Sequence, residues 1–160
     1  MSSAYEGLPV YKASTDMVSY FETIVRGFPR YHKYTIGTEL RNLSYAILDL
    51  IVEANRKIDR VEKLKIVLNK LQKLKSRLQV CFEIKAFRNP NSFPTATRKV
   101  IDIAKQCEGW LWKCQNPGRE VPLRENANMK SLGTHATDKL GIRTQGVVPQ
   151  GSASDGPKRR

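Results

Sequence analysis

The sequence has little of what enzymes and membrane proteins need. Two of its 160 residues are histidine, and neither His32 nor His135 has a Cys, Asp or Glu at metal-ligand spacing. Glycine-rich phosphate-binding motifs and the Glu-x-x-His pairs of di-iron bundles are absent from it. No apolar run reaches the roughly 20 residues that a membrane span requires. We therefore expect a protein that is not an enzyme, holds no cofactor or metal, and does not enter a membrane.

Cysteine is also scarce, and targeting signals are not visible. Cys107 and Cys114 lie seven residues apart, which is about 10 Å along a helix and too far for a disulfide. Together with Cys81 they form no C-x-x-C pair, so we expect three reduced thiols in or near the core. The first dozen residues do not have a charged region followed by an apolar core. We therefore expect no signal peptide and a cytoplasmic protein.

Positive charge, by contrast, is in excess. The chain has 28 Lys and Arg against 15 Asp and Glu, which gives a net charge of +13. Eleven of the basic residues lie between Arg56 and Arg88, where only Asp59, Glu62 and Glu83 are acidic. Binding of phosphates or carboxylates relieves such self-repulsion, so we expect a polyanionic partner. Nucleic acid is the commonest one, and an acidic protein or an anionic membrane surface are the competing interpretations.

Apolar residues at helical spacing predict four amphipathic helices. They are expected at about Tyr11–Phe28, Thr35–Ala54, Ile58–Phe87 and Ser92–Lys113. Pro29 stops the first helix, and the run Asn89-Pro90-Asn91-Ser92 separates the last two. Four such helices with short connections predict an all-α protein, an antiparallel four-helix bundle.

The third predicted helix concentrates the basic residues. Its expected apolar seam is Ile58, Val61, Leu64, Leu68, Leu71, Leu74, Leu78 and Cys81. At about 100° per residue, five cations share one sector on the side opposite this seam. They are Arg56, Arg60, Lys63, Lys70 and Arg77. Lys57 and Lys73 flank the sector, and Arg26, Arg30, Lys33 and Arg41 add charge around the first turn. A phosphate-binding face is the hypothesis, and a solvated helix surface without a ligand is the alternative.

Four aromatic residues could stack on bases, but we prefer a structural interpretation for most of them. Tyr31 and Tyr34 are expected to brace the first turn, and Trp110 to fill the core. Trp112 is out of register with Trp110 and is expected near the surface or at a subunit contact.

Composition changes after Cys114. The segment 115–160 holds six of the ten glycines, four of the eight prolines and no Phe, Trp or Tyr. Such a segment buries too little apolar surface to offset the entropy of ordering it. We therefore divide the chain into a four-helix bundle, 1–114, and a disordered basic tail, 115–160.

Several segments resemble a superfamily of bacterial four-helix-bundle proteins. These segments are Leu8–Ser14 (LPVYKAS), Phe28–Gly37 (FPRYHKYTIG), Leu40-Arg41 and Gly109-Trp110-Leu111. The resemblance extends from about Leu8 to Lys113. The superfamily includes bundles encoded in intervening sequences of 23S ribosomal RNA genes, and the accessory variability determinant of diversity-generating retroelements. The strongly basic third helix is more similar to the retroelement protein.

The resemblance to the retroelement protein implies an assembly and a function. In that family the bundle forms a basic, barrel-shaped homopentamer without catalytic activity. It binds the error-prone reverse transcriptase and nucleic acid, and it supports cDNA synthesis from template-repeat RNA. We therefore expect a bacterial or phage-encoded accessory protein that binds reverse transcriptase and template-repeat RNA or DNA. An intervening-sequence-type protein that binds RNA or protein, and a purely structural oligomer, are the alternatives.

Overall fold

The computed structural model describes residues 5–120, so the predicted tail falls outside the described residues except for its first few. Five helices make up most of this part of the chain, with no strand among these residues. They are α1 (Pro9–Arg26), α2 (Arg30–Lys33), α3 (Ile36–Asn55), α4 (Arg60–Glu83) and α5 (Ser92–Gln115). The predicted all-α class is confirmed. Between residues 5 and 120, no helix is both long and apolar enough to cross a membrane.

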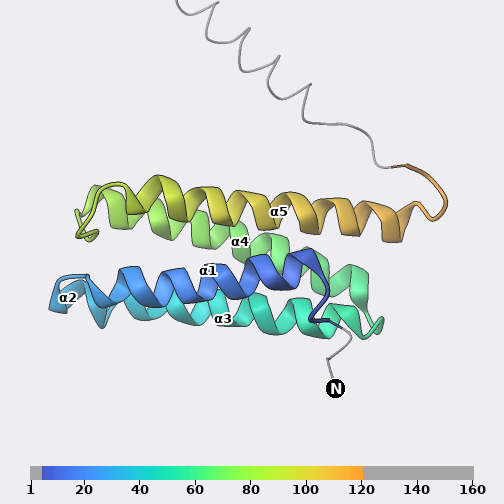
Figure 1. The fold of residues 1–160 in the computed structure, drawn as a ribbon, viewed down its shortest axis with the longest axis horizontal. Helices are drawn as coiled ribbons and strands as arrows, with labels where there is room; N and C mark the ends of the chain where they lie inside the picture. Colours follow the sequence, from blue (N-terminus) through green and yellow to red (C-terminus); the bar gives the residue numbers. More distant parts are fainter. Residues whose placement is uncertain (1–4, 121–160) are drawn as a thin grey trace, which may run out of the picture. The chain divides into compact units, whose positions relative to one another are not determined.

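The four long helices pack as an antiparallel bundle (Figure 1). Each contacts two neighbours, in the cyclic order α1, α3, α4, α5. Successive helices reverse direction because the connections between them are short. One end of the bundle, at the left of Figure 1, joins the end of α1, the short helix α2 and the α4–α5 connection. We call this end, formed by residues 26–36 and 84–91, the α2 end.

The core runs along the interior of the bundle. The buried residues of α4 are Leu64, Val67, Leu71, Leu74, Leu78 and Cys81, stepped alternately by three and four. This seam was predicted correctly from Leu71 onward and at Leu64. It included Leu68, which is half-buried and packs against the core, but it missed Val67, which is fully buried. It was also wrong at Ile58, which is 67 % exposed because it lies before the helix begins.

The third helix was predicted too long at both ends: it was expected at Ile58–Phe87, and α4 spans Arg60–Glu83. Lys57 and Asp59 have positive φ angles of 71° and 50°, and Lys85 has one of 58°. Such left-handed conformations are uncommon outside glycine and interrupt a right-handed helix. Arg56 and Lys57 therefore lie in the α3–α4 connection rather than on α4. The predicted turn after the first helix also contains a single helical turn, α2.

A close approach between α1 and α3 holds the α2 end in place. Gly37 is buried in the first turn of α3. A Cβ atom at this position would lie 2.8 Å from Cγ1 of Val25 and 3.0 Å from the carbonyl oxygen of His32. Any side chain there would push the two helices apart. This glycine, part of the FPRYHKYTIG segment, thus fixes how α2 is seated between α1 and α3.

All three cysteines are free thiols, which confirms the prediction. Cys81 and Cys107 are buried and Cys114 is half-buried. Desolvation by burial raises the pKa of both Cys81 and Cys107 to about 12. Because the thiolate is the reactive form, these two thiols are inert near neutral pH and act as small apolar residues of the core.

Candidate nucleic-acid interface

The sector of cations predicted on the third helix lies along the border between α4 and α3. We call its members on α4, namely Arg60, Lys63, Lys70 and Arg77, the row; most of them contact α3. Arg60 reaches back to the end of α3, where its Nε donates to the carbonyl oxygen of Ala54 at 2.8 Å. Its Nη2 donates to the carbonyl oxygen of Asn55 at 3.2 Å. Its guanidinium also lies 5.3 Å from the ring centre of Trp110. Arg60 therefore satisfies carbonyls that a helix end leaves unpaired, and its charge favours the negative end of the α3 dipole.

Two more cations of the row pair with carboxylates of α3. Lys63 Nζ lies 3.7 Å from Glu53 Oε2, and Arg77 Nε lies 2.6 Å from Glu39 Oε1. Together with Arg60 they connect α4 to α3 along much of its length. The expectation that the sector lies opposite the packed side of the helix is wrong, because Glu39, Glu53 and the end of α3 lie beside it.

Lys70 of the row and the flanking Lys73 differ from Arg60, Lys63 and Arg77, which contact α3. Neither makes an ion pair or a side-chain hydrogen bond within the described residues. Both line an open groove of about 530 Å³ between α3 and α4, together with Tyr34, Thr38 and Asn42. Glu39 also lines this groove, but Arg77 neutralises it. The groove therefore carries a net positive charge contributed by α4.

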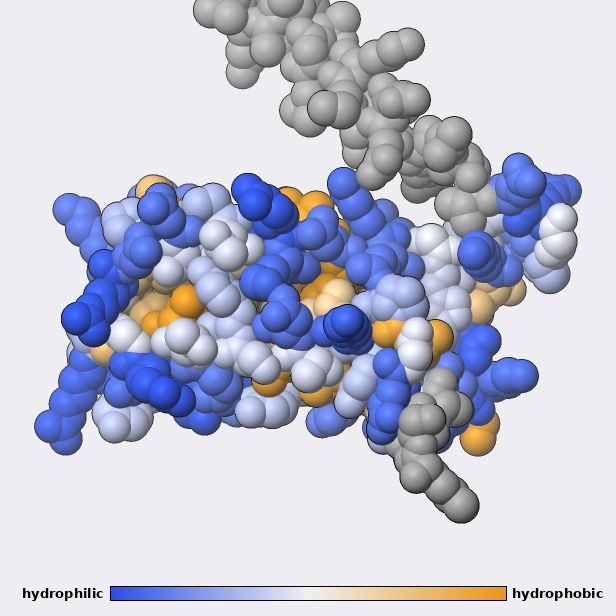
Figure 2. Space-filling model, viewed as in Figure 1, coloured by the Kyte–Doolittle hydropathy of each residue, from blue (hydrophilic) through white to orange (hydrophobic). Residues whose placement is uncertain are grey.

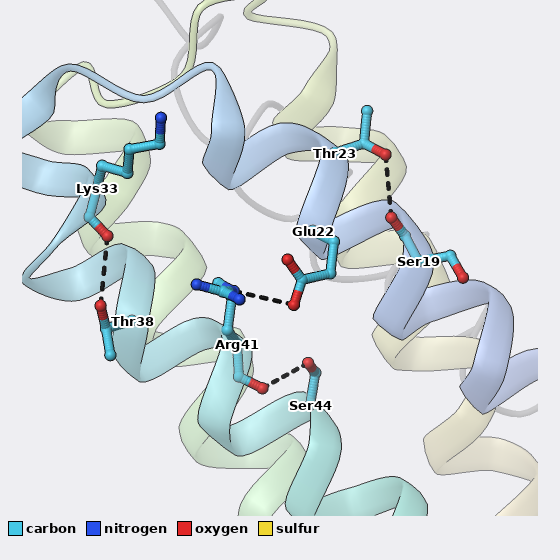
Figure 3. Close-up of polar contacts among 7 residues, drawn as sticks. All are labelled: Ser19, Glu22, Thr23, Lys33, Thr38, Arg41 and Ser44. Carbon is cyan, nitrogen blue, oxygen red and sulfur yellow. Dashed lines mark hydrogen bonds and ion pairs between the residues drawn. The ribbon is translucent and has the colours of Figure 1, made fainter.

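The cations around the first turn also divide into those with an ion pair and those without one. Arg41 pairs with Glu22 of α1 at 2.9 Å, a contact that links α1 to α3 (Figure 3). The same carboxylate raises the pKa of the neighbouring Tyr45 hydroxyl. Lys33 takes part in the fold through its backbone, since its carbonyl oxygen accepts a 3.4 Å hydrogen bond from the Thr38 hydroxyl (Figure 3). Its ammonium group has no partner among the described residues.

The α2 end gathers five cations that have no ion pair among the described residues. Arg26 and Arg30, both predicted as binding residues, lie there in exposed positions. Lys33, also predicted to add charge there, lies on α2, and the fold adds Lys85 and Arg88 from the α4–α5 connection. No ion pair or side-chain hydrogen bond engages any of these five within residues 5–120. Hydrophilic side chains project from this end of the molecule in Figure 2, beside a smaller hydrophobic patch. We call this set of residues the α2-end cluster: Arg26, Arg30, Lys33, Lys85 and Arg88.

Lys85 and Arg88 were not predicted as site residues. Both lie more than fifty residues from Arg26 and Arg30 in the sequence, and no local pattern links them. The predicted topology could have indicated that they come together, because the first and third connections of an antiparallel bundle lie at the same end. The approach is close: a Cβ atom on Gly27 would lie 3.5 Å from Cβ of Arg88.

The tyrosines of the first turn are not packed as expected. Tyr31 is 77 % exposed and Tyr34 69 % exposed, so neither braces the turn from inside. The turn is held instead by Phe28, whose ring lies 5.5 Å from that of Phe87 in an edge-to-face contact. Trp110 packs against the core as predicted, and Trp112 is half-buried. Across residues 5–120, no three His, Cys, Asp or Glu side chains gather in a way that could hold a metal ion.

The comparison with known families decides between the two branches of the resemblance. A model of the bAvd-like family matches residues 10–114. The chain belongs to the bAvd-like family. The abbreviation stands for accessory variability determinant, so the resemblance found in the sequence is confirmed. No curated protein matches the chain.

The bAvd-like match covers the parts of the structure that carry unpaired positive charge. It begins in the first turn of α1 and ends one residue before the end of α5. It therefore includes the α2-end cluster and the groove between α3 and α4. By its name the bAvd-like family is one of accessory proteins rather than enzymes.

Proposed function

We propose that this protein is a non-catalytic accessory component of a diversity-generating retroelement. It binds nucleic acid mainly through phosphates and also binds the reverse transcriptase, so that template-repeat RNA and polymerase are held together during cDNA synthesis. Membership of the bAvd-like family supports the retroelement setting. The observation that carries the nucleic-acid part is the distribution of charge, which leaves a cluster of cations at one end without acidic partners.

The support for nucleic-acid binding comes from the cations that have no carboxylate partner, rather than from the net charge of the protein. Cations that already contact carboxylates, such as Arg41, Lys63 and Arg77, can offer phosphates only a partly neutralised site. The five cations of the α2-end cluster and the two lysines of the α3–α4 groove have no such partner among residues 5–120. Phosphate contacts of this kind position a nucleic acid without reading its sequence. We therefore expect binding with weak sequence preference.

Binding to RNA is expected to weaken steeply as salt is added. Five phosphate contacts at about −0.7 each give a slope of about −3.5 in a plot of log K against log salt. Affinity should then fall by about a hundredfold between roughly 50 and 200 mM salt. Fluorescence anisotropy with a labelled template-repeat RNA measures this slope. A slope near zero would mean that the unpaired cations do not contact phosphates.

The polymerase part of the proposal has its own test. A tagged form of the protein, expressed with the reverse transcriptase encoded beside it, should retain that enzyme through washes and after nuclease treatment. The nuclease removes retention that depends only on shared RNA. Retention of RNA without the enzyme would refute the polymerase part of the proposal and leave an RNA-binding protein with no retroelement role.

The proposal includes a closed homo-oligomer, for which the resemblance gives the number five. Apolar side chains left exposed on the monomer support a subunit contact: Tyr45 on α3 and Ile66 and Val80 on α4 are each more than 40 % exposed. A ring closes when a heterologous contact returns on itself. Light scattering of the full chain at micromolar concentration is expected to give the mass of a pentamer. A monomer mass under these conditions would refute the assembly.

A further inference from the structure

We propose that the α2 end binds single-stranded nucleic acid, with phosphates held by the α2-end cluster and unpaired bases stacked on Tyr31 and Tyr34. This inference rests on the proposed function, because it specifies where and in which form the nucleic acid is bound. Three observations carry it: an open cleft lined by two arginines, two exposed aromatic rings next to it in the chain, and a charged groove beyond them.

The cleft lies between the end of α1 and the α4–α5 connection. Its volume is about 500 Å³, within the range of sites that hold small ligands. Arg26 and Arg88 line it from the two segments, and Ile24 and Phe87 give it apolar walls. Neither arginine has an acidic partner in the described part of the chain. A phosphate group placed between them would therefore meet two free guanidinium groups, the side chains best suited to bidentate phosphate contact.

In the chain, Tyr31 and Tyr34 come between Arg26, which lines the cleft, and the first residues of α3, which line the charged groove. Among the large apolar side chains of residues 5–120, Tyr31 and Tyr34 have the highest exposed fractions, 77 % and 69 %. Tyr34 also lines the α3–α4 groove that contains Lys70 and Lys73. The cleft lies on the side of the bundle where α1 meets α5, and the groove lies where α3 meets α4. A strand that reaches both would have to pass around the α2 end, which carries the two tyrosines.

Exposed rings favour a single strand over a duplex. Bases in a duplex are stacked on one another and cannot place their faces on a protein ring, whereas unpaired bases can. Proteins that bind single strands combine a positively charged path with aromatic side chains on which successive bases stack. A duplex would use only the cations of the α2 end and would leave both tyrosines without a contact. The combination found at the α2 end therefore fits a single strand.

Two variants separate the base contacts from the phosphate contacts. In the first, Tyr31→Leu and Tyr34→Leu remove the ring faces and keep apolar side chains. Tyr11→Leu, near the start of α1, is the control for loss of a tyrosine elsewhere. In the second, glutamine replaces Arg26, Arg30 and Arg88. Its control has glutamine at three exposed cations away from the α2 end, namely Lys75, Arg98 and Lys113. Circular dichroism melts of all variants establish that they fold like the unmodified chain.

The probes are a labelled oligouridine of about 20 nucleotides and a labelled RNA duplex of the same length, measured by fluorescence anisotropy. The tyrosine variant is expected to lose about tenfold or more in affinity for oligouridine and to bind the duplex unchanged. The arginine variant should lose affinity for both probes, with a salt slope lowered by about two units. Both controls should stay within about threefold of the unmodified chain.

The outcomes distinguish this inference from the proposed function. If the unmodified chain binds neither probe, the nucleic-acid part of the proposed function fails and the inference fails with it. If the unmodified chain binds oligouridine but the tyrosine variant binds it equally well, the proposed function stands and the stacking site is refuted. If the control with Lys75, Arg98 and Lys113 replaced loses as much affinity as the arginine variant, the α2 end is not the site.

Discussion

Replacement of Leu74 by aspartate is expected to unfold the bundle. Leu74 is fully buried in the seam of α4, among side chains that offer a carboxylate no partner. Burying an unpaired charge and removing an apolar side chain together cost at least ~4 kcal/mol, most of the stability of a small domain. Loss of the helical signal at room temperature in far-ultraviolet circular dichroism, or a melting temperature lowered by tens of degrees, is the expected result.

The matched control is Ser76→Asp, two residues further along the same helix. Ser76 is exposed, so this variant places the same aspartate and the same added charge on α4 without burial. It should melt within a few degrees of the unmodified chain, since exposed substitutions change stability by only about 0.5 kcal/mol. If Leu74→Asp melts like Ser76→Asp, α4 does not face the core as the structure has it.

Arg60→Gln is expected to destabilise the bundle even though its side chain lies at the surface. The change removes two charge-assisted hydrogen bonds to the last carbonyls of α3 and the contact with Trp110. The loss should be about 1–3 kcal/mol in the free energy of unfolding, measured by urea denaturation. Arg60→Lys should recover only part of it, because one ammonium group cannot reproduce the two directed contacts of the guanidinium.

Lys70→Gln is the comparison for Arg60→Gln. Both residues were predicted to bind phosphate from the same sector of the helix, but Lys70 has no ion pair or side-chain hydrogen bond in the described part of the chain. Its replacement should leave the unfolding free energy unchanged within ~0.5 kcal/mol. Equal losses for Lys70→Gln and Arg60→Gln would contradict the capping role of Arg60.

Helical periodicity predicts the bundle but not where its third long helix begins and ends. The helical spacing of apolar residues predicts the four long helices, because each helix must bury one face and its apolar residues lie on that face. The ends of α4 depend on left-handed backbone at Lys57, Asp59 and Lys85. No glycine or proline stands at these positions to signal it. Whether Val67 or Leu68 is the more deeply buried likewise depends on where α3 and α5 contact α4, which the sequence of α4 does not show.

The candidate interface was harder to predict than the fold for a different reason. Sequence periodicity shows which cations share a face of one helix, and it groups Arg60, Lys63, Lys70 and Arg77 correctly. It does not show what lies opposite that face, so it cannot tell a paired cation from a free one. The acidic partners of this row, Glu39 and Glu53, belong to another helix. The α2-end cluster was missed in part because Lys85 and Arg88 join it only through tertiary structure.

The uneven pairing of charges gives the described part of the chain an electric dipole. Five cations without an ion pair stand at the α2 end, with Glu83 as the nearest carboxylate in the chain, whereas in the α3–α4 connection Arg56 and Lys57 stand with Asp59. An approaching polyanion would therefore rotate the bundle until the α2 end faces it, before any contact is made. Such orientation raises the rate of productive encounters, and added salt weakens it. If the proposed cyclic ring of copies forms, the α2 ends of its subunits would lie on one circle, and their fields would add on one rim of the assembly.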